Sequence, residues 1–168
     1  SYNIDSGTVY LLKDGEQIDR VSYDSDWHFS LLDNTDGVSL ERLLPDAMSN
    51  QATNWHSAAE SIGFATPGRI NSQFQFGETT ESISLQNDVF SPDLDGFEDV
   101  LMVNYSFSQA GLLGKARVFD DIGREVKTIF SNELLATSGF FSWDGIMNEQ
   151  VKAPIGVYIL LVEVFSTD

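Results

Sequence analysis

The chain contains no cysteine among its 168 residues. Disulfides, zinc sites built on thiolates and catalytic thiols are therefore excluded. A chain of this length buries roughly 70% of the surface that it exposes when unfolded, so its stability does not require a disulfide. The lack of cysteine is compatible with oxidising and with reducing compartments and does not decide between them.

Basic residues are scarce. Nine Lys and Arg stand against 26 Asp and Glu, which gives a formal net charge of −17. Binding to nucleic acid depends on cationic side chains that neutralise phosphates, and anionic lipid surfaces attract the same side chains. The composition therefore argues against nucleic acid and against an anionic membrane surface as partners. An acidic surface favours solubility and attracts cations, including calcium.

Long apolar runs are missing as well, because no run approaches the roughly 20 residues that span a bilayer. The sequence begins at Ser1, without an initiator methionine or a signal-peptide pattern. We therefore expect the chain to be a fragment of a longer precursor or a processed product.

Short β-strand patterns dominate what the sequence does contain. Two strand-like runs, of which the second alternates apolar with polar residues, lie on either side of Asp14-Gly15, a dipeptide that is typical of hairpin turns. The strands predicted in this half are residues 8–12, 17–23 and 37–42. Residues 44–71 contain turn residues instead and are predicted to be loops, with at most one helical turn at 57–61.

A polar stretch at residues 75–82 predicts a boundary between two domains, residues 1–76 and 77–168. Beyond it, strand patterns and turn residues alternate at a spacing of roughly ten residues, as in β-sandwiches. The strands predicted there are residues 83–89, 100–107, 114–120, 125–130, 139–143 and 156–165. The sequence therefore predicts an all-β chain with two small β-sandwich domains, each lacking terminal strands because the outermost strands have no obvious partner.

An acidic loop lies early in the second half. Asp93, Asp95 and Asp99 are spaced i, i+2, i+6 around Gly96, and Asp88 precedes them. Calcium takes about six to eight oxygen ligands, and Asp-x-Asp-Gly loops direct carboxylates to one point. The bidentate glutamate of an EF-hand loop is missing, so the loop is not an EF-hand. The pattern predicts a calcium site formed by the four aspartates; the alternative is an ordinary acidic β-turn.

A catalytic constellation is hard to assemble from this sequence. His28 and His56 are its only histidines. His56 and Ser57 are neighbours whose side chains point to opposite faces of a strand, so they do not readily share a proton. Pairs of carboxylates are expected in a chain with 26 acidic residues and do not by themselves indicate a glycosidase. The sequence therefore predicts that the chain is not an enzyme.

Trp27 is the aromatic residue with the best prospect of exposure. Most other aromatic side chains fall at alternating strand positions that predict burial, whereas Trp27 lies in a polar segment, residues 23–29. An exposed tryptophan is suited to a ligand or a protein partner. Trp27 is therefore a candidate for binding a surface glycan or a protein, although this segment would equally serve to cover the open end of a sandwich.

Several motifs of the first half share one resemblance. They are Gly37-Val38-Ser39-Leu40-Glu41-Arg42, Asn54-Trp55-His56-Ser57-Ala58, Thr66-Pro67-Gly68 and Asn71-Ser72. Residues 5–74 resemble the closing half of the bacterial lamin-tail domain, which is an immunoglobulin-like β-sandwich. The resemblance implies that the opening strands of such a domain are not in this chain.

A second resemblance covers residues 83–165. Its motifs are Phe90 to Gly96, Val118 to Arg124, Phe140-Phe141-Ser142-Trp143-Asp144-Gly145 and Ala153 to Tyr158. They resemble the flagellar-hook-cap-type immunoglobulin-like domain, and the first also resembles the opening of the related gliding-motility and type IX sorting domains. The last strand of that family is not in this sequence.

The second resemblance implies a function outside catalysis. Domains of this kind close secreted proteins of gliding bacteria and direct export through the periplasm and outer membrane to the cell surface. The expected role is a structural spacer and an export or surface-attachment module, recognised by the outer-membrane type IX translocon or its shuttle proteins. A carbohydrate- or protein-binding adhesion module is the alternative.

Overall fold

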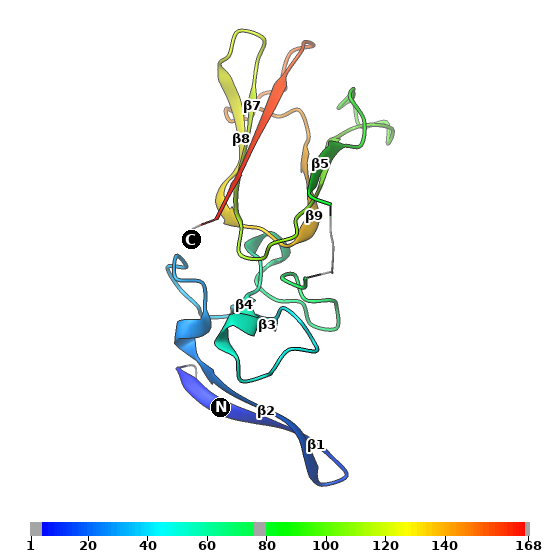
Figure 1. The fold of residues 1–168 in the computed structure, drawn as a ribbon. Coiled ribbons are helices and arrows are strands. Elements are labelled where there is room, and N and C mark those ends of the chain that lie inside the picture. Colours follow the sequence, from blue (N-terminus) through cyan, green and yellow to red (C-terminus); the bar gives the residue numbers. More distant parts are fainter. Residues whose placement is uncertain (1–4, 76–79, 167–168) are drawn as a thin grey trace. The chain divides into compact units, whose positions relative to one another are not determined.

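The computed structural model describes residues 5–75 and 80–166 of the chain (Figure 1). The chain divides into two compact units, residues 1–75 and 76–168, and each is described by itself. Part of the polar stretch predicted to separate two domains, residues 76–79, lies outside the described residues. All strand pairs in the described ranges are antiparallel, and the helical elements there are single 3₁₀ turns. The prediction of an all-β fold is therefore confirmed for those ranges, and no helix in them is long and apolar enough to cross a membrane.

The first unit consists of short strands and 3₁₀ turns joined by long loops. Its elements are β1 (Ser6–Lys13), β2 (Glu16–Asp24), η1 (Ser25–Trp27), β3 (Leu40–Arg42), η2 (Ala52–Asn54), β4 (Trp55–Ser57) and η3 (Glu60–Ile62). They form two separate two-stranded sheets, β1-β2 and β3-β4.

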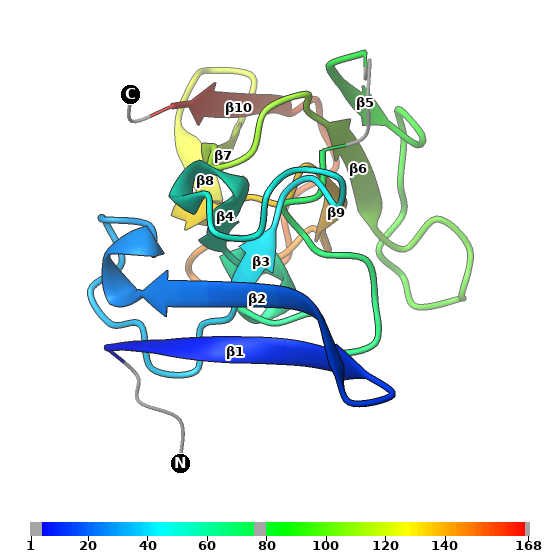
Figure 2. The same cartoon turned by 60° about the horizontal axis from the view of Figure 1, so that its bottom comes forward.

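Strands β1 and β2 form the predicted hairpin around Asp14-Gly15, and Figure 2 shows them side by side. Asp14 and Gly15 both have positive φ angles, 54° and 85°, as the tightest hairpin turns require. Val9 lies opposite Val21, so these two apolar side chains share one face, whereas Tyr10 lies opposite Arg20 on the other.

The sheet β3-β4 differs from the sequence-based expectation. The strand predicted at residues 37–42 is confined to Leu40–Arg42, and β4 lies where a loop was predicted. Three residues carry too little alternation to be recognised, and β4 forms because β3 offers it a partner, with Glu41 opposite His56. The helical turn considered at residues 57–61 is observed slightly later, as η3, and ends at Gly63 with φ 80°.

The centre of the first unit is a polar network. Glu41 is 3% exposed, and its carboxylate accepts hydrogen bonds from the Thr66 hydroxyl, the Ser72 hydroxyl at 2.6 Å and the Gln73 amide at 3.1 Å. These bonds join β3 to the loop that closes the unit. Buried carboxylates are costly unless they are hydrogen-bonded in this way, so the network fixes one path for that loop.

The second unit contains two three-stranded sheets. Its strands are β5 (Ser82–Leu85), β6 (Leu101–Ser106), β7 (Leu113–Phe119), β8 (Glu125–Leu134), β9 (Ser138–Trp143) and β10 (Ile159–Phe165). The sheet orders are β5-β6-β9 and β10-β7-β8, and Figure 1 shows β7 and β8 on one side of this unit and β5 and β9 on the other.

Three of the predicted strand ranges change. The strand predicted at residues 83–89 ends at Leu85, and the strand predicted at 156–165 begins only at Ile159. Val89 and Val157 continued the apolar pattern in the sequence, but their side chains are about three-quarters exposed. Strand β8 instead runs on to Leu134, because it pairs with β7 along its whole length through several irregularities in register.

The apolar core of the second unit contains residues from both sheets. Val103 and Trp143 come from one sheet and Val118 and Val126 from the other, and all four are buried in one cluster. A second cluster contains Tyr105, Phe107, Leu112 and Leu135. In β6 the buried side chains alternate with more exposed ones, as the sequence pattern predicted.

Replacing Glu41 with alanine should destabilise the first unit by about 3 kcal/mol, because three hydrogen bonds to a buried carboxylate would be lost. Urea unfolding followed by the fluorescence of Trp27 and Trp55 measures the change. Glu60, an exposed glutamate of the same unit, supplies the control: Glu60→Ala should shift stability by no more than about 0.5 kcal/mol. Equal effects of the two substitutions would contradict the structural role of Glu41.

Candidate functional site

The acidic loop between β5 and β6 is folded by its own hydrogen bonds. The carboxylate of Asp99 accepts from the amides of Leu94 at 2.6 Å and Gly96 at 2.8 Å. Asp95 accepts from the Phe97 amide at 2.8 Å. Leu94 and Gly96 have φ angles of 65° and 89°, and these left-handed residues turn the chain around the carboxylates. The loop is therefore an ordered turn built around its acidic side chains.

Three of the four predicted calcium ligands come together in this loop. Carboxylate oxygens of Asp93, Asp95 and Asp99 all lie within 4.8 Å of one another, with Asp99 half-buried and the other two exposed. Asp88, the fourth predicted ligand, is exposed and is not a member of this group. Each carboxylate oxygen has more than one lone pair, so main-chain hydrogen bonds leave acceptor capacity for a hard cation. The three carboxylates could together hold a hard cation such as calcium.

Aromatic packing anchors the start of the loop to the core. The Phe90 ring meets the Trp143 ring edge-on, with centroids 5.5 Å apart, and Trp143 meets Tyr158 in the same way at 5.1 Å. A Cβ atom at Gly145 would lie 2.8 Å from the Pro92 ring, so only glycine allows this approach. Packing of Phe90 and Pro92 against Trp143 and Gly145 therefore fixes the position of the start of the loop.

A lysine adds a polar tether at the same place. The Lys152 ammonium donates to the Pro92 carbonyl at 2.6 Å. It comes from the turn between β9 and β10, where Ala153 also donates its amide to the Gly145 carbonyl at 2.8 Å. The base of the acidic loop is therefore joined to the much later segments around Gly145 and Lys152.

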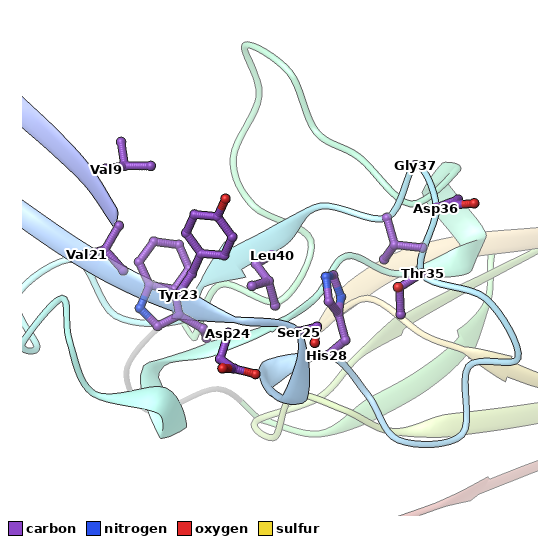
Figure 3. A pocket seen from close by; sticks show the side chains of 12 residues that line it. Val9, Val21, Tyr23, Asp24, Ser25, His28, Thr35, Asp36, Gly37 and Leu40 are labelled. Atoms are coloured by element: carbon purple, nitrogen blue, oxygen red, sulfur yellow. The ribbon is translucent and has the colours of Figure 1, made fainter. Parts of the chain in front are cut away.

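A pocket of about 460 Å³ lies in the first unit (Figure 3). Its apolar walls come from the hairpin and from the residues leading into β3, and its polar groups from the segments around η1 and Asp36. The lining residues are Val9, Val21, Tyr23, Asp24, Ser25, His28, Thr35, Asp36, Gly37, Val38, Leu40 and Trp55. Its size and mixed lining match sites for small ligands.

The predicted ligand-binding residue, Trp27, stands beside this pocket without lining it. Trp27 is half-buried, and its ring lies 6.3 Å from that of Trp55, which does line the pocket. The Trp55 indole donates to the Ser49 carbonyl at 2.8 Å and is thereby fixed in place. Trp27 therefore presents only part of its ring to solvent.

His28 occupies a role that the sequence did not reveal. Its Nδ1 lies 2.9 Å from the Ser57 hydroxyl, which also accepts from the Phe29 amide at 2.9 Å. Burial, and to a lesser degree the charge of nearby His56, hold the pKa of His28 below its ordinary value. Because Ser57 is fully buried, this pair ties η1 to β4 and does not offer a nucleophile to solvent. His28 and Ser57 are 29 positions apart in the sequence, so no local pattern predicts their contact.

Neighbouring His56 contacts the main chain of Ser57. Its Nδ1 lies 3.0 Å from the main-chain carbonyl of Ser57 and not from that residue's hydroxyl. The two side chains are divided between the faces of β4, as residues of a strand must be.

Comparison with known proteins gives no family assignment: no protein-family model matches the chain, and no curated protein matches it.

Calcium should stabilise the second unit if the aspartate loop binds it. At a tenfold excess over its dissociation constant the ion would add about 1.4 kcal/mol, or a rise in unfolding temperature of several degrees. Calorimetry with calcium and with a chelator measures the difference. Asp95→Asn keeps an acceptor for the Phe97 amide but removes a charge, and it should abolish the shift. Asp121→Asn, an exposed acid outside the loop, should retain it. Identical unfolding temperatures with calcium and with chelator in the unmodified chain would rule the site out.

Proposed function

We propose that this chain is a non-catalytic part of a secreted bacterial surface protein, in which it acts as a structural spacer and as an export and surface-attachment module. Its recognition partner would be the outer-membrane type IX translocon or a shuttle protein of that apparatus. The acidic composition and the all-β fold agree with an exported surface protein.

One observation carries the proposal most directly. The motifs on which the resemblance to sorting-type domains rests lie far apart in the sequence, but Phe90 and Pro92 of the first contact Trp143 and Gly145 of another. Lys152, just before the last motif, binds the Pro92 carbonyl. If the motifs belong to a single type of domain, their residues are expected to pack together, and these residues do.

The arrangement of the second unit supports the finer fold assignment. We infer that the sheets β5-β6-β9 and β10-β7-β8 are the two layers of an immunoglobulin-like sandwich. The core cluster contains Val103 of one sheet and Val118 of the other, as expected for facing layers. Such a domain is a stable platform with loops at its ends, and the acidic loop is one of them.

A similar argument applies to the first unit and the lamin-tail resemblance. Glu41 belongs to the first of its motifs, and its carboxylate binds Thr66 and Ser72 of the later ones. Asn71 donates to the Arg42 carbonyl at 3.0 Å and so joins the first of these motifs to the last a second time. We infer that this unit is the closing half of a lamin-tail-like sandwich that serves as a spacer.

Export of a reporter tests the main proposal. The complete 168-residue chain, fused behind a signal peptide and a fluorescent reporter in a gliding bacterium, should carry the reporter to the cell surface. A strain without the type IX translocon should keep it in the periplasm. Trp143→Ala should reduce surface display, whereas Phe97→Ala, an exposed aromatic of the acidic loop, should not affect the core. Retention of the reporter in the periplasm of the intact strain would refute the proposal.

An adhesion module is the second candidate, and the pocket beside Trp27 favours it. Partly exposed aromatic rings together with carboxylates suit the apolar face and the hydroxyls of a sugar ring. If this reading is right, the chain should bind members of a glycan array, Trp27→Ala should weaken binding roughly tenfold, and Trp27→Phe should retain most of it. Phe97→Ala in the other unit is the control. Binding unchanged by Trp27→Ala would exclude this residue as a contact.

A further inference from the structure

The two edges of the hairpin β1-β2 differ in what covers them. The Ser25 amide donates to the Asp5 carbonyl at 2.6 Å, so Asp5 and Ser25 form a hydrogen-bonded pair of the ladder. Bonds in an antiparallel pair alternate, so Gly7, Val9 and Leu11 direct their main-chain groups towards β2. Ser6, Thr8 and Tyr10 direct theirs away from it, to the outer edge of β1.

The outer edge of β2 is covered by the loop after β3. The Ser22 amide, which points away from β1, donates to the Asn50 side chain at 2.7 Å. Asp19 accepts from the Ser49 hydroxyl at 2.6 Å and forms an ion pair with Arg42 at 3.5 Å. Side chains therefore blunt this edge against another strand.

The outer edge of β1 has no such cover among the residues that the structure describes. Within those residues β1 belongs to a two-stranded sheet and has β2 as its single neighbour, and in Figure 2 β1 lies at the bottom of the view with β2 above it. Its apolar side chains are open to solvent: Val9 is 39% exposed, Tyr10 53%, Leu11 57% and Leu12 59%. A strand of this kind, eight residues long and without proline, is a template for pairing with another strand.

The sequence of β1 complements itself in one antiparallel register. If two copies pair about Val9, Thr8 of each copy lies opposite Tyr10 of the other, so the outward main-chain groups meet. Val9 then faces Val9 at the closest pair of the ladder, and Asp5 faces Lys13 on both sides of the axis. Moving the axis to Thr8 or Tyr10 loses both Asp5–Lys13 pairs.

We propose that β1 is a self-association edge, through which two copies of this chain form a continuous four-stranded antiparallel sheet. We assign the edge to a second copy, and not to the opening strands that a lamin-tail-like sandwich would add, because the register about Val9 matches hydrogen-bonding groups, apolar side chains and charges at the same time. Charge matters here because the chain as a whole is strongly acidic, with a net charge of −17. Association of like-charged molecules needs local pairs of opposite sign.

Sedimentation equilibrium of the 168-residue chain should show a monomer–dimer equilibrium between about 1 μM and about 1 mM protein. The salt concentration is about 0.15 M, at which the Debye length is roughly 8 Å. Thr8→Pro removes an outward amide without touching the ladder to β2, and it should abolish the dimer. Thr8→Ala loses the same hydroxyl but keeps the amide, and it should leave the dimer. Amide hydrogen exchange of Val9 and Leu11 checks that the hairpin survives in both variants.

Charge reversal tests the register itself. Asp5→Lys and Lys13→Asp each place like charges opposite one another twice, so each variant alone should dimerise roughly tenfold more weakly. An equimolar mixture of the two should recover the dimer, because every pair in the mixed dimer again has opposite signs. The double variant keeps the net charge of −17 and should also recover it.

Monomer at every concentration would overturn the proposal. A dimer that withstands Thr8→Pro would show that another surface associates. A dimer that is weakened by Thr8→Pro but responds equally to the single and double charge variants would overturn the register about Val9.

Discussion

The Trp143 side chain connects the parts of the second unit that lie far apart in the sequence. The residue is 3% exposed and belongs to the core cluster that contains Val118 and Val126 of the other sheet. Its ring also meets Phe90 and Tyr158, and its indole nitrogen donates to the Ile146 carbonyl at 3.1 Å. A large aromatic side chain with a satisfied polar group makes all these contacts from one position. The geometry of the acidic loop therefore depends on the packing of the core beneath it.

The first unit is organised around buried polar side chains and not around an apolar core. Its most deeply buried side chains include Ser57 and Gln73, and Glu41 and Asn54 are nearly as inaccessible. Each is held by specific hydrogen bonds, as where Asn54 exchanges two with the main chain of Leu44 at 2.9 and 3.0 Å. Such a network selects one conformation but buries little apolar surface. The buried hydrophobic residues among the described part of this unit are the small Ala58 and Ala59, so the network defines one conformation without a large apolar core.

The strands that were predicted correctly are those whose sequence signals are local or whose buried face is apolar. The hairpin β1-β2 was predictable because its turn dipeptide and alternation are local, and β6 and β7 were predictable because one face is consistently buried. Strand β4 escaped recognition because it depends on β3, and β5 was predicted too long because Val89 is apolar but exposed. Hydrophobicity alone does not distinguish a strand residue from an exposed loop residue.

The candidate sites follow the same division between local and distant information. The aspartates 93, 95 and 99 were predictable as a group because their spacing already brings them together in one turn, whereas Asp88 precedes that turn and is not part of the group. The pocket collects Val9, His28 and Asp36 from three separate segments, and no spacing rule links them. Tertiary contacts such as that between His28 and Ser57 bring those segments together.

The acidity of the chain and its open strand edge act on different length scales. At physiological salt, repulsion between surfaces fades within roughly 8 Å, so a net charge of −17 opposes the approach of two copies but contributes less once they touch. At contact, the ladder of main-chain hydrogen bonds and the nearest side-chain pairs decide the outcome. Negative charge thus disfavours non-specific association, while pairing at a strand edge favours one register. Solubility and selective pairing would then come from different features of the same sequence.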